Sequence, residues 1–185
     1  MKQLLVLGIV AVVLVIAVIA YRNGLIAKDE AVKADWSQID AQLVRRADLV
    51  PNLVATVKGY ATHEKDIFTA VADARSRLLG AQGPAAKAEA SAQLNGMLGR
   101  LLAIAENYPN LKASDTFIRL QDELAGTENR IAVARTRYNE TVRIFNATLR
   151  GFPGSLFAPG LGLKPAEYFQ PPQGKDVQDV PKVQF

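Results

Sequence analysis

Apolar and polar residues divide the chain into a continuous apolar segment, a long region with a seven-residue apolar repeat, and a tail rich in glycine and proline. The first segment, Leu4–Tyr21, has no charge across 18 residues, and Lys2 and Arg22 bracket it. As a helix it spans roughly 27 Å, at the short end for a bilayer. A cleaved signal peptide usually has an apolar core of only about 7–15 residues. Although Val18–Ala20 would permit cleavage, the pattern favours a retained transmembrane anchor over residues 1–24.

Beyond the anchor, apolar residues recur at every seventh position in two parallel series. Such a repeat predicts a long helix packed lengthwise on its neighbours with a left-handed crossing. Pro51 lies inside the repeat, but the phase is the same on both sides. We therefore predict a kink at Pro51 within one helix that continues to Leu78. The series are Trp36, Leu43, Val50, Val57, Glu64, Val71, Leu78 and Val32, Ile39, Arg46, Leu53, Tyr60, Ile67, Ala74.

Two further helices follow. The glycines and proline of Gly80–Pro84 predict a turn, and an alanine- and leucine-rich second helix then runs until the segment at Pro109 ends it. Ser114 is a suitable N-cap for a third helix, which repeats the heptad from Phe117 and ends before Gly151. Short connections predict an up-down-up course in which the first and third helices are parallel.

The predicted fold class is therefore all-α. It consists of the transmembrane helix, an elongated antiparallel bundle of three to four long helices over residues 25–151 with coiled-coil-like packing, and an extended C-terminal tail. Residues 152–170 of the tail carry more large apolar side chains than a disordered segment normally has, so we expect them to pack on the bundle or on a partner. Residues 171–185 are predicted to be a flexible C-terminus.

Several polar residues fall on or close to the apolar seams of the first and third helices. We interpret them as interhelical ion pairs and hydrogen bonds that fix the register of the bundle, so that loss of Glu128 would destabilise it if its partner stays buried. The alternative is a buried catalytic or ligand site, for which a helical seam offers no obvious room. The residues are Arg46, Glu64, Glu128, Arg135, Asn139 and Asn146.

Familiar catalytic and metal-binding patterns are missing. The chain has no cysteine, which excludes disulfides and thiolate metal sites. Its one histidine, His63, is not followed by the second histidine of HExxH, and Tyr60 stands where the ExxH motif of a di-iron bundle needs glutamate. We therefore predict no catalytic residue, no metal site and no cofactor, and we expect His63 to be an ordinary helix residue.

Charge narrows the choice of partners. The chain has 22 Lys and Arg against 18 Asp and Glu, which gives a net charge of +4 without a basic cluster. Arg119, Arg130 and Arg137 share one side of a helix, but such a row is more typical of a solvated face, so no nucleic acid is expected.

The basic residues around the apolar segment bear on its orientation in the membrane. Arg22, Lys28 and Lys33 follow the segment, whereas only Lys2 precedes it. The positive-inside rule thus favours a cytoplasmic C-terminal domain, although the sequence leaves the side open.

From the anchor to about Phe169, the chain closely resembles the bacterial LemA family. The resemblance rests on the stretches "WSQIDAQLVRRADLVPNLVATVKGYATHE", "LLAIAENYPNLKASDTFIRLQDELAGTENRIAVARTRYNETVRIFN" and "FPGSLFAPGLGLKPAEYF". It implies a single-pass protein of the bacterial inner membrane with an elongated antiparallel bundle, and no established reaction or cofactor. Magnetosome-associated relatives suggest membrane-organising roles. The specific motifs are Arg46, Asp48, Leu49, Pro51 and Asn52; Tyr60, His63 and Glu64; Glu106, Tyr108 and Pro109; Glu128, Asn129, Arg135, Tyr138 and Asn139; and Phe152 and Pro153.

The function expected from these observations is that of a membrane-anchored interaction or scaffold protein, and not of an enzyme. Its expected partners are the lipid bilayer and either further copies of the chain or another membrane protein. The alternative is an accessory or sensory module that binds a small ligand or lipid, or an unrecognised hydrolytic activity at the polar seam. The predicted partner contacts are Trp36, Phe157, Tyr168 and Phe169, with packing inside their own bundle as the alternative.

Overall fold

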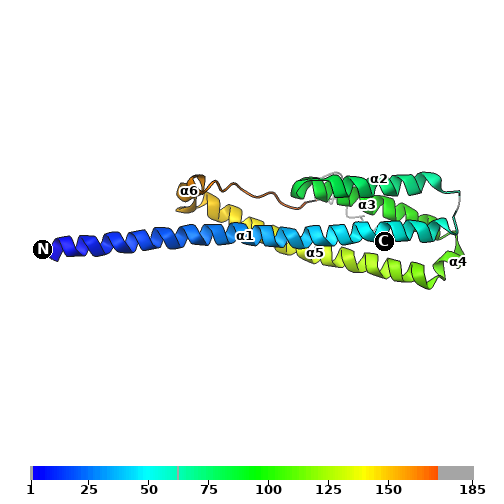
Figure 1. Ribbon diagram of the computed structural model, residues 1–185, viewed down its shortest axis with the longest axis horizontal. Helices are drawn as coiled ribbons and strands as arrows, with labels where there is room; N and C mark the ends of the chain where they lie inside the picture. The colour runs from blue at the N-terminus through cyan, green and yellow to red at the C-terminus, as the bar shows by residue number, and fades with distance from the viewer. Residues whose placement is uncertain (1, 62, 171–185) are drawn as a thin grey trace, which may run out of the picture. The chain divides into compact units, whose positions relative to one another are not determined.

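A computed structural model describes residues 2–61 and 63–170 of the chain, and the predicted C-terminus over 171–185 lies outside the described residues. The described residues form helices without any strand, which confirms the all-α fold class (Figure 1). The elements are α1 (Lys2–Lys58), α2 (Lys65–Gly80), α3 (Gly83–Ala105), α4 (Pro109–Lys112), α5 (Asp115–Arg150), α6 (Gly154–Phe157) and the 3-10 helix η1 (Pro159–Leu161).

The apolar segment and the start of the heptad repeat belong to one helix. α1 is long and apolar enough at its N-terminal end to cross a membrane, and that end is not covered by other parts of the protein. The helix does not end at Asn23-Gly24, and it continues through Pro51, as predicted for the proline. The same helix therefore supplies the candidate anchor and a large part of the buried core.

The prediction of one helix from Val32 to Leu78 is wrong, because α1 ends at Lys58 and α2 begins at Lys65. Gly59 follows the last helical residue, and the N–H groups of Tyr60 and Ala61 both donate to the carbonyl of Val57, at 3.0 and 2.9 Å. The chain then reverses, so that α2 runs antiparallel to the end of α1 (Figure 1). The reversal adds a helix to the bundle.

That extra reversal also overturns the predicted parallel arrangement of the first and third helices. The C-terminal part of α1 and the N-terminal part of α5 are antiparallel, since Gln42 contacts Arg130 while Arg46 contacts Glu128. The turn at Gly80–Pro84 and the end of α5 before Gly151 are where the sequence predicted them.

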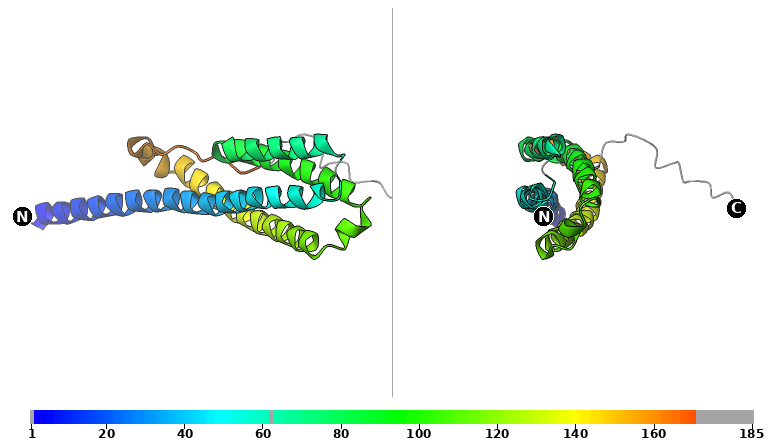
Figure 2. Two further views of the ribbon diagram at one scale, coloured as in Figure 1. Left: turned by 45° about the vertical axis from the view of Figure 1, so that its right-hand side comes forward. Right: turned by 90° about the vertical axis from the view of Figure 1, so that its right-hand side faces the viewer.

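The chain divides into two compact units, to both of which α1 and α5 contribute. Among the described residues, the first unit contains the chain from Lys2 to Gln38 together with Thr136–Glu167, and the second contains Ile39–Arg135 together with residues 168–170. In the second unit the parts of α1 and α5 join α2 and α3, and successive helices alternate in direction (Figures 1 and 2). Its buried core includes Leu43, Val50, Leu53, Val57, Val71, Leu78, Leu94, Leu98, Leu101, Phe117, Leu124 and Ile131.

In the first unit, residues of α1 pack against the C-terminal part of α5. The rings of Trp36 and Tyr138 are 5.7 Å apart between centroids, and Tyr138 is almost fully buried. Beyond α5, the short helices α6 and η1 return to α1, where the Phe157 ring lies 5.7 Å from the Tyr21 ring. The other buried apolar residues of this unit include Leu25, Val32, Val142, Phe145 and Leu149.

Candidate functional site: polar contacts between the helices

Arg46 of α1 and Glu128 of α5 form an ion pair inside the second unit, between Nη1 and Oε2. The Arg46 side chain is 8% exposed, whereas that of Glu128 is 48% exposed. Asn95 of α3 donates from Nδ2 to the same carboxylate oxygen at 3.5 Å. One carboxylate thus joins three helices. Its two neighbours are incompletely satisfied, because Arg46 Nε and Asn95 Oδ1 are buried without a hydrogen-bond partner.

Further polar contacts join the helices of this unit in pairs. Lys87 of α3 forms an ion pair of 2.6 Å with Asp40 of α1. Arg75 of α2 donates from Nε to the carbonyl of Ala47 in α1 at 2.7 Å. Side-chain contacts of this kind fix how neighbouring helices are aligned, which is the role predicted for the polar seam.

Three of the predicted seam residues, Glu64, Arg135 and Asn139, lie elsewhere. Glu64 lies in the connection between α1 and α2, where it precedes the first residue of α2 without making a side-chain cap. His63 is exposed in the same connection and is not a helix residue. Arg135 lies on the exposed side of α5, and Asn139 is half-buried and interacts within the chain. The seam residues are therefore dispersed over several environments.

Asn146 has a different role from the one predicted, because it binds the tail. Its side chain is nearly fully buried, Nδ2 donates to the carbonyl of Ala166 at 2.9 Å, and Oδ1 accepts from the N–H of Ala166 at 2.8 Å. About two turns earlier on α5, the Tyr138 hydroxyl donates to the carbonyl of Glu167 at 2.7 Å. Two side chains of α5 thus hold consecutive tail residues.

Replacing Asn146 with alanine removes both hydrogen bonds and leaves the half-buried N–H and carbonyl of Ala166 without these partners. We expect a loss of about 1–2 kcal/mol in the free energy of unfolding and much faster hydrogen exchange at Ala166. Hydrogen exchange measured by mass spectrometry on peptides containing residues 164–169 checks this. Asn129, which is exposed on α5, provides the matched control, because Asn129→Ala removes no contact with the tail. Unchanged exchange at Ala166 would contradict the assigned role of Asn146.

A buried carboxylate that the sequence did not single out lies in the first unit. Asp35 of α1 is 7% exposed, forms an ion pair of 2.9 Å with Arg137 Nε, and accepts a hydrogen bond from Thr141 Oγ1 at 2.7 Å. Arg137 therefore acts as an ion-pair partner within the chain, although much of its side chain remains exposed. This cluster joins α1 to α5, as the Arg46–Glu128 pair does in the other unit.

The four predicted partner contacts differ in exposure. Trp36 packs on Tyr138 and Phe157 packs on Tyr21, and both are half-buried. Phe169 is 4% exposed, so its ring is covered by the protein itself. Tyr168 is 37% exposed and is the most exposed of the four.

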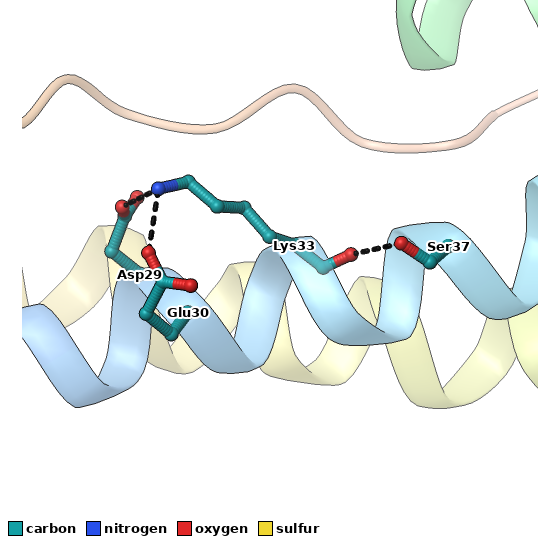
Figure 3. A network of polar contacts seen from close by, with 4 residues as sticks. All are labelled: Asp29, Glu30, Lys33 and Ser37. Atoms are coloured by element: carbon teal, nitrogen blue, oxygen red, sulfur yellow. Dashed lines mark hydrogen bonds and ion pairs between the residues drawn. The ribbon is translucent and has the colours of Figure 1, made fainter.

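A surface network follows the apolar segment on α1 (Figure 3). Lys33 Nζ lies 2.8 Å from Asp29 and 2.7 Å from Glu30, and the Ser37 hydroxyl donates to the Lys33 carbonyl at 3.1 Å. Hydrogen bonds to Asp29 and then to Glu30 raise the pKa of Lys33 above its usual range. Lys33 therefore stays positively charged on this stretch of α1 under all physiological conditions.

Burial, together with the negative charge of Glu167, raises the pKa of Tyr138 to about 12. The ordinary value is about 10. Because the folded value is the higher one, Tyr138 stabilises the fold fully below about pH 10, and this contribution is lost as the pH rises towards 12. At neutral pH, Tyr138→Phe is expected to cost about 1 kcal/mol through the lost hydrogen bond. The unfolding midpoints of the two proteins should converge between pH 10 and 12, and parallel curves would contradict the raised pKa.

Within residues 2–61 and 63–170, no three His, Cys, Asp or Glu side chains come together in a way that could hold a metal ion. The buried carboxylate of Asp35 and the half-exposed carboxylate of Glu128 are instead paired with arginines. The arrangement of these residues can align helices and hold the tail.

Comparison with known proteins agrees with the family resemblance of the motifs. The LemA family model matches residues 35–185. Magnetosome protein MamQ 2 of Paramagnetospirillum magneticum is 29% identical, over 90% of this chain and 71% of its own length. Magnetosome protein MamQ of Magnetospirillum gryphiswaldense is 28% identical, over 91% and 72%. Protein LemA of Metamycoplasma hominis is 25% identical, over 80% and 68%. Since the family model covers most of the chain, including both partners of the Arg46–Glu128 pair, this protein belongs to the LemA family.

Proposed function

We propose that this protein is a scaffold of the bacterial inner membrane, in which α1 anchors a helical bundle that binds a second membrane protein or further copies of the chain. The observation that carries the proposal is the double role of α1. Its N-terminal part is apolar and uncovered, while its later residues, such as Leu25 and Leu43, are buried in the two units. The helix that would enter the membrane is therefore also a core helix of the folded part.

The polar contacts between the helices support a scaffold role over an enzymatic one. Glu128 contacts Arg46 and Asn95, and Asp35 contacts Arg137 and Thr141. A catalytic acid or base needs a free position beside a pocket that admits substrate. These carboxylates are instead held by side chains of neighbouring helices. Neither of the relatives' names, magnetosome protein and LemA, denotes a reaction.

Native mass spectrometry of the protein, extracted from its own membrane in mild detergent, tests this proposal. A defined homo-oligomer, or a protein that co-purifies in fixed stoichiometry, is the expected result. A monomer that retains a small molecule would contradict the scaffold and would favour the alternative, a sensory or accessory module. The double variant Asp35→Asn, Arg137→Gln is a useful comparison, since it alters a pair between α1 and α5 and leaves the exposed surface of α2 and α3 unchanged.

We also propose that the bundle lies on the cytoplasmic side. Arg22, Lys28 and Lys33 follow the apolar segment closely, and the pairing of Lys33 with acidic neighbours does not weaken the argument, because acidic residues contribute little to the positive-inside rule. The absence of cysteine makes the test direct. A membrane-impermeant maleimide applied to intact spheroplasts should label Gln3→Cys, and should label Val133→Cys only after lysis. The reverse labelling would place the bundle on the outer side.

A further inference from the structure

The segment from Gly151 to Leu163, which we call the α6 segment, contains α6 and η1 and has no charged residue across its 13 positions. Arg150 and Lys164 flank it directly. Two of its large apolar side chains project away from the protein, because Phe152 is 89% exposed and Leu156 is 68% exposed. Exposed apolar side chains gathered in one segment can mark a contact with a membrane or a protein partner.

The α6 segment is held at one end of the apolar stretch of α1. The ring of Phe157 lies 5.7 Å from the ring of Tyr21, which is the last residue of the uncharged stretch Leu4–Tyr21. At Gly154, the position of an added Cβ would be 3.0 Å from the Tyr21 hydroxyl. Arg22 follows as the first charge after the stretch. The α6 segment therefore lies where α1 would leave the hydrocarbon of a bilayer.

A groove at the same level is also suited to lipid. It has a volume of about 420 Å³ and lies between α1 and the last turns of α5, with Ala17 and Gly24 among its apolar lining and Thr148 on the α5 side. Tyr21 lines it as well, and Lys28 contributes an ammonium group on the side away from the span. An acyl chain fits the apolar part, while a headgroup phosphate would meet Lys28.

We propose that the α6 segment is a second membrane contact of this protein, in which Phe152 and Leu156 enter the boundary between headgroups and acyl chains beside α1. Tyrosine at the end of a span and basic residues just outside it are typical of that boundary. Arg150 and Lys164 can extend their charged ends towards the headgroups while the segment between them is immersed. The bilayer accounts for the exposure of both apolar side chains. This contact goes beyond the scaffold role, although it requires that α1 spans the membrane.

Single-cysteine variants of the full chain test the contact, since the natural sequence has no cysteine. Leu156→Cys, labelled with the environment-sensitive dye NBD, is reconstituted in vesicles of phosphatidylcholine and phosphatidylglycerol. Val133→Cys is the matched control, because Val133 is an apolar residue of α5 with 72% exposure outside the α6 segment. Val12→Cys, in the apolar stretch of α1, reports separately whether the anchor is inserted.

The expected result is strong quenching at position 156 by lipids that carry a doxyl group near the headgroup, with quenching by aqueous iodide several-fold weaker than at position 133. If iodide quenches positions 156 and 133 equally while doxyl lipids quench position 12, the proposal is overturned although the anchor is intact. Shielding of position 156 from both quenchers overturns it as well and assigns this surface to a protein contact. Absence of lipid quenching at position 12 overturns both the contact and the membrane-anchored scaffold.

Discussion

Replacing Glu128 with alanine is expected to lower the free energy of unfolding by about 2–3 kcal/mol. The variant leaves the guanidinium of Arg46 buried without its counter-ion, and breaking a buried pair in this way is strongly destabilising. The expected loss is below the upper range for such pairs because half of the Glu128 side chain is exposed, so water screens part of the interaction. Asn95 loses its acceptor at the same time.

The two partners should respond unequally. Arg46→Met replaces a buried cation by an apolar side chain of similar length, and it leaves Glu128 free to turn towards water. We expect this change to stay within about 1 kcal/mol of the natural protein, because an apolar side chain often replaces a buried ion at little cost. The double variant Arg46→Met, Glu128→Ala should then recover most of the stability that Glu128→Ala alone loses.

Chemical denaturation of the full chain in mild detergent, followed by circular dichroism, measures all three variants. Equal losses of unfolding free energy in the two single variants would contradict the expected effect of the difference in burial between Arg46 and Glu128. An unchanged midpoint for Glu128→Ala would mean that the pair contributes nothing to the bundle. Glu123, which is exposed on α5, supplies the control for removal of a glutamate from this helix.

Much of the helical core could be predicted from the sequence alone. The heptad series of the third helix, which includes Phe117, Ile131 and Phe145, is buried in α5. The end of that helix before Gly151 was also predictable from its C-terminal glycine. Both signals are local, since a repeat of apolar residues fixes which face of a helix is buried without reference to the partner helix.

The break between α1 and α2 was missed because the connection preserves the heptad phase. Val57 and Val71 are both buried and are two heptads apart, yet they lie on different helices. Periodicity alone cannot distinguish one long helix from two helices joined by a turn of that length. The usable signals were Gly59 after the last turn of α1 and the polar residue Glu64 at an apolar position.

The polar contacts were only partly predictable for a related reason. Arg46 and Glu128 stand at apolar positions of the repeat, and this mismatch singled out two residues that form an ion pair between α1 and α5. Asp35 gave no such signal, because it becomes buried only when Arg137 and Thr141 of α5 face it across the first unit. Which residues face each other depends on the register of α1 against α5, and the predicted parallel arrangement gave the wrong register.

Replacing Gly154 with alanine is expected to displace α6 and to cost about 3 kcal/mol, at the upper end for overpacked positions. An added Cβ would lie 1.9 Å from the carbonyl oxygen of Thr148, a backbone atom that cannot move without distorting the last turns of α5. It would also lie 3.0 Å from the Tyr21 hydroxyl, so the contact between Tyr21 and Phe157 should be lost with the clash. Glycine is thus required here by close approach.

Hydrogen exchange in the α6 segment provides the measurement. The N–H of Ser155 donates to the carbonyl of Gly151 and that of Ala158 to the carbonyl of Gly154, each at 2.9 Å, so both should exchange much faster in Gly154→Ala. Gly160→Ala is the matched control, because a Cβ at Gly160 meets no atom within 4 Å. If both variants kept the natural exchange rates, α6 would not depend on the close approach to α5. If exchange is faster only in Gly154→Ala, the lack of a side chain at Gly154 is what allows the α6 segment to pack on α1 beside Tyr21.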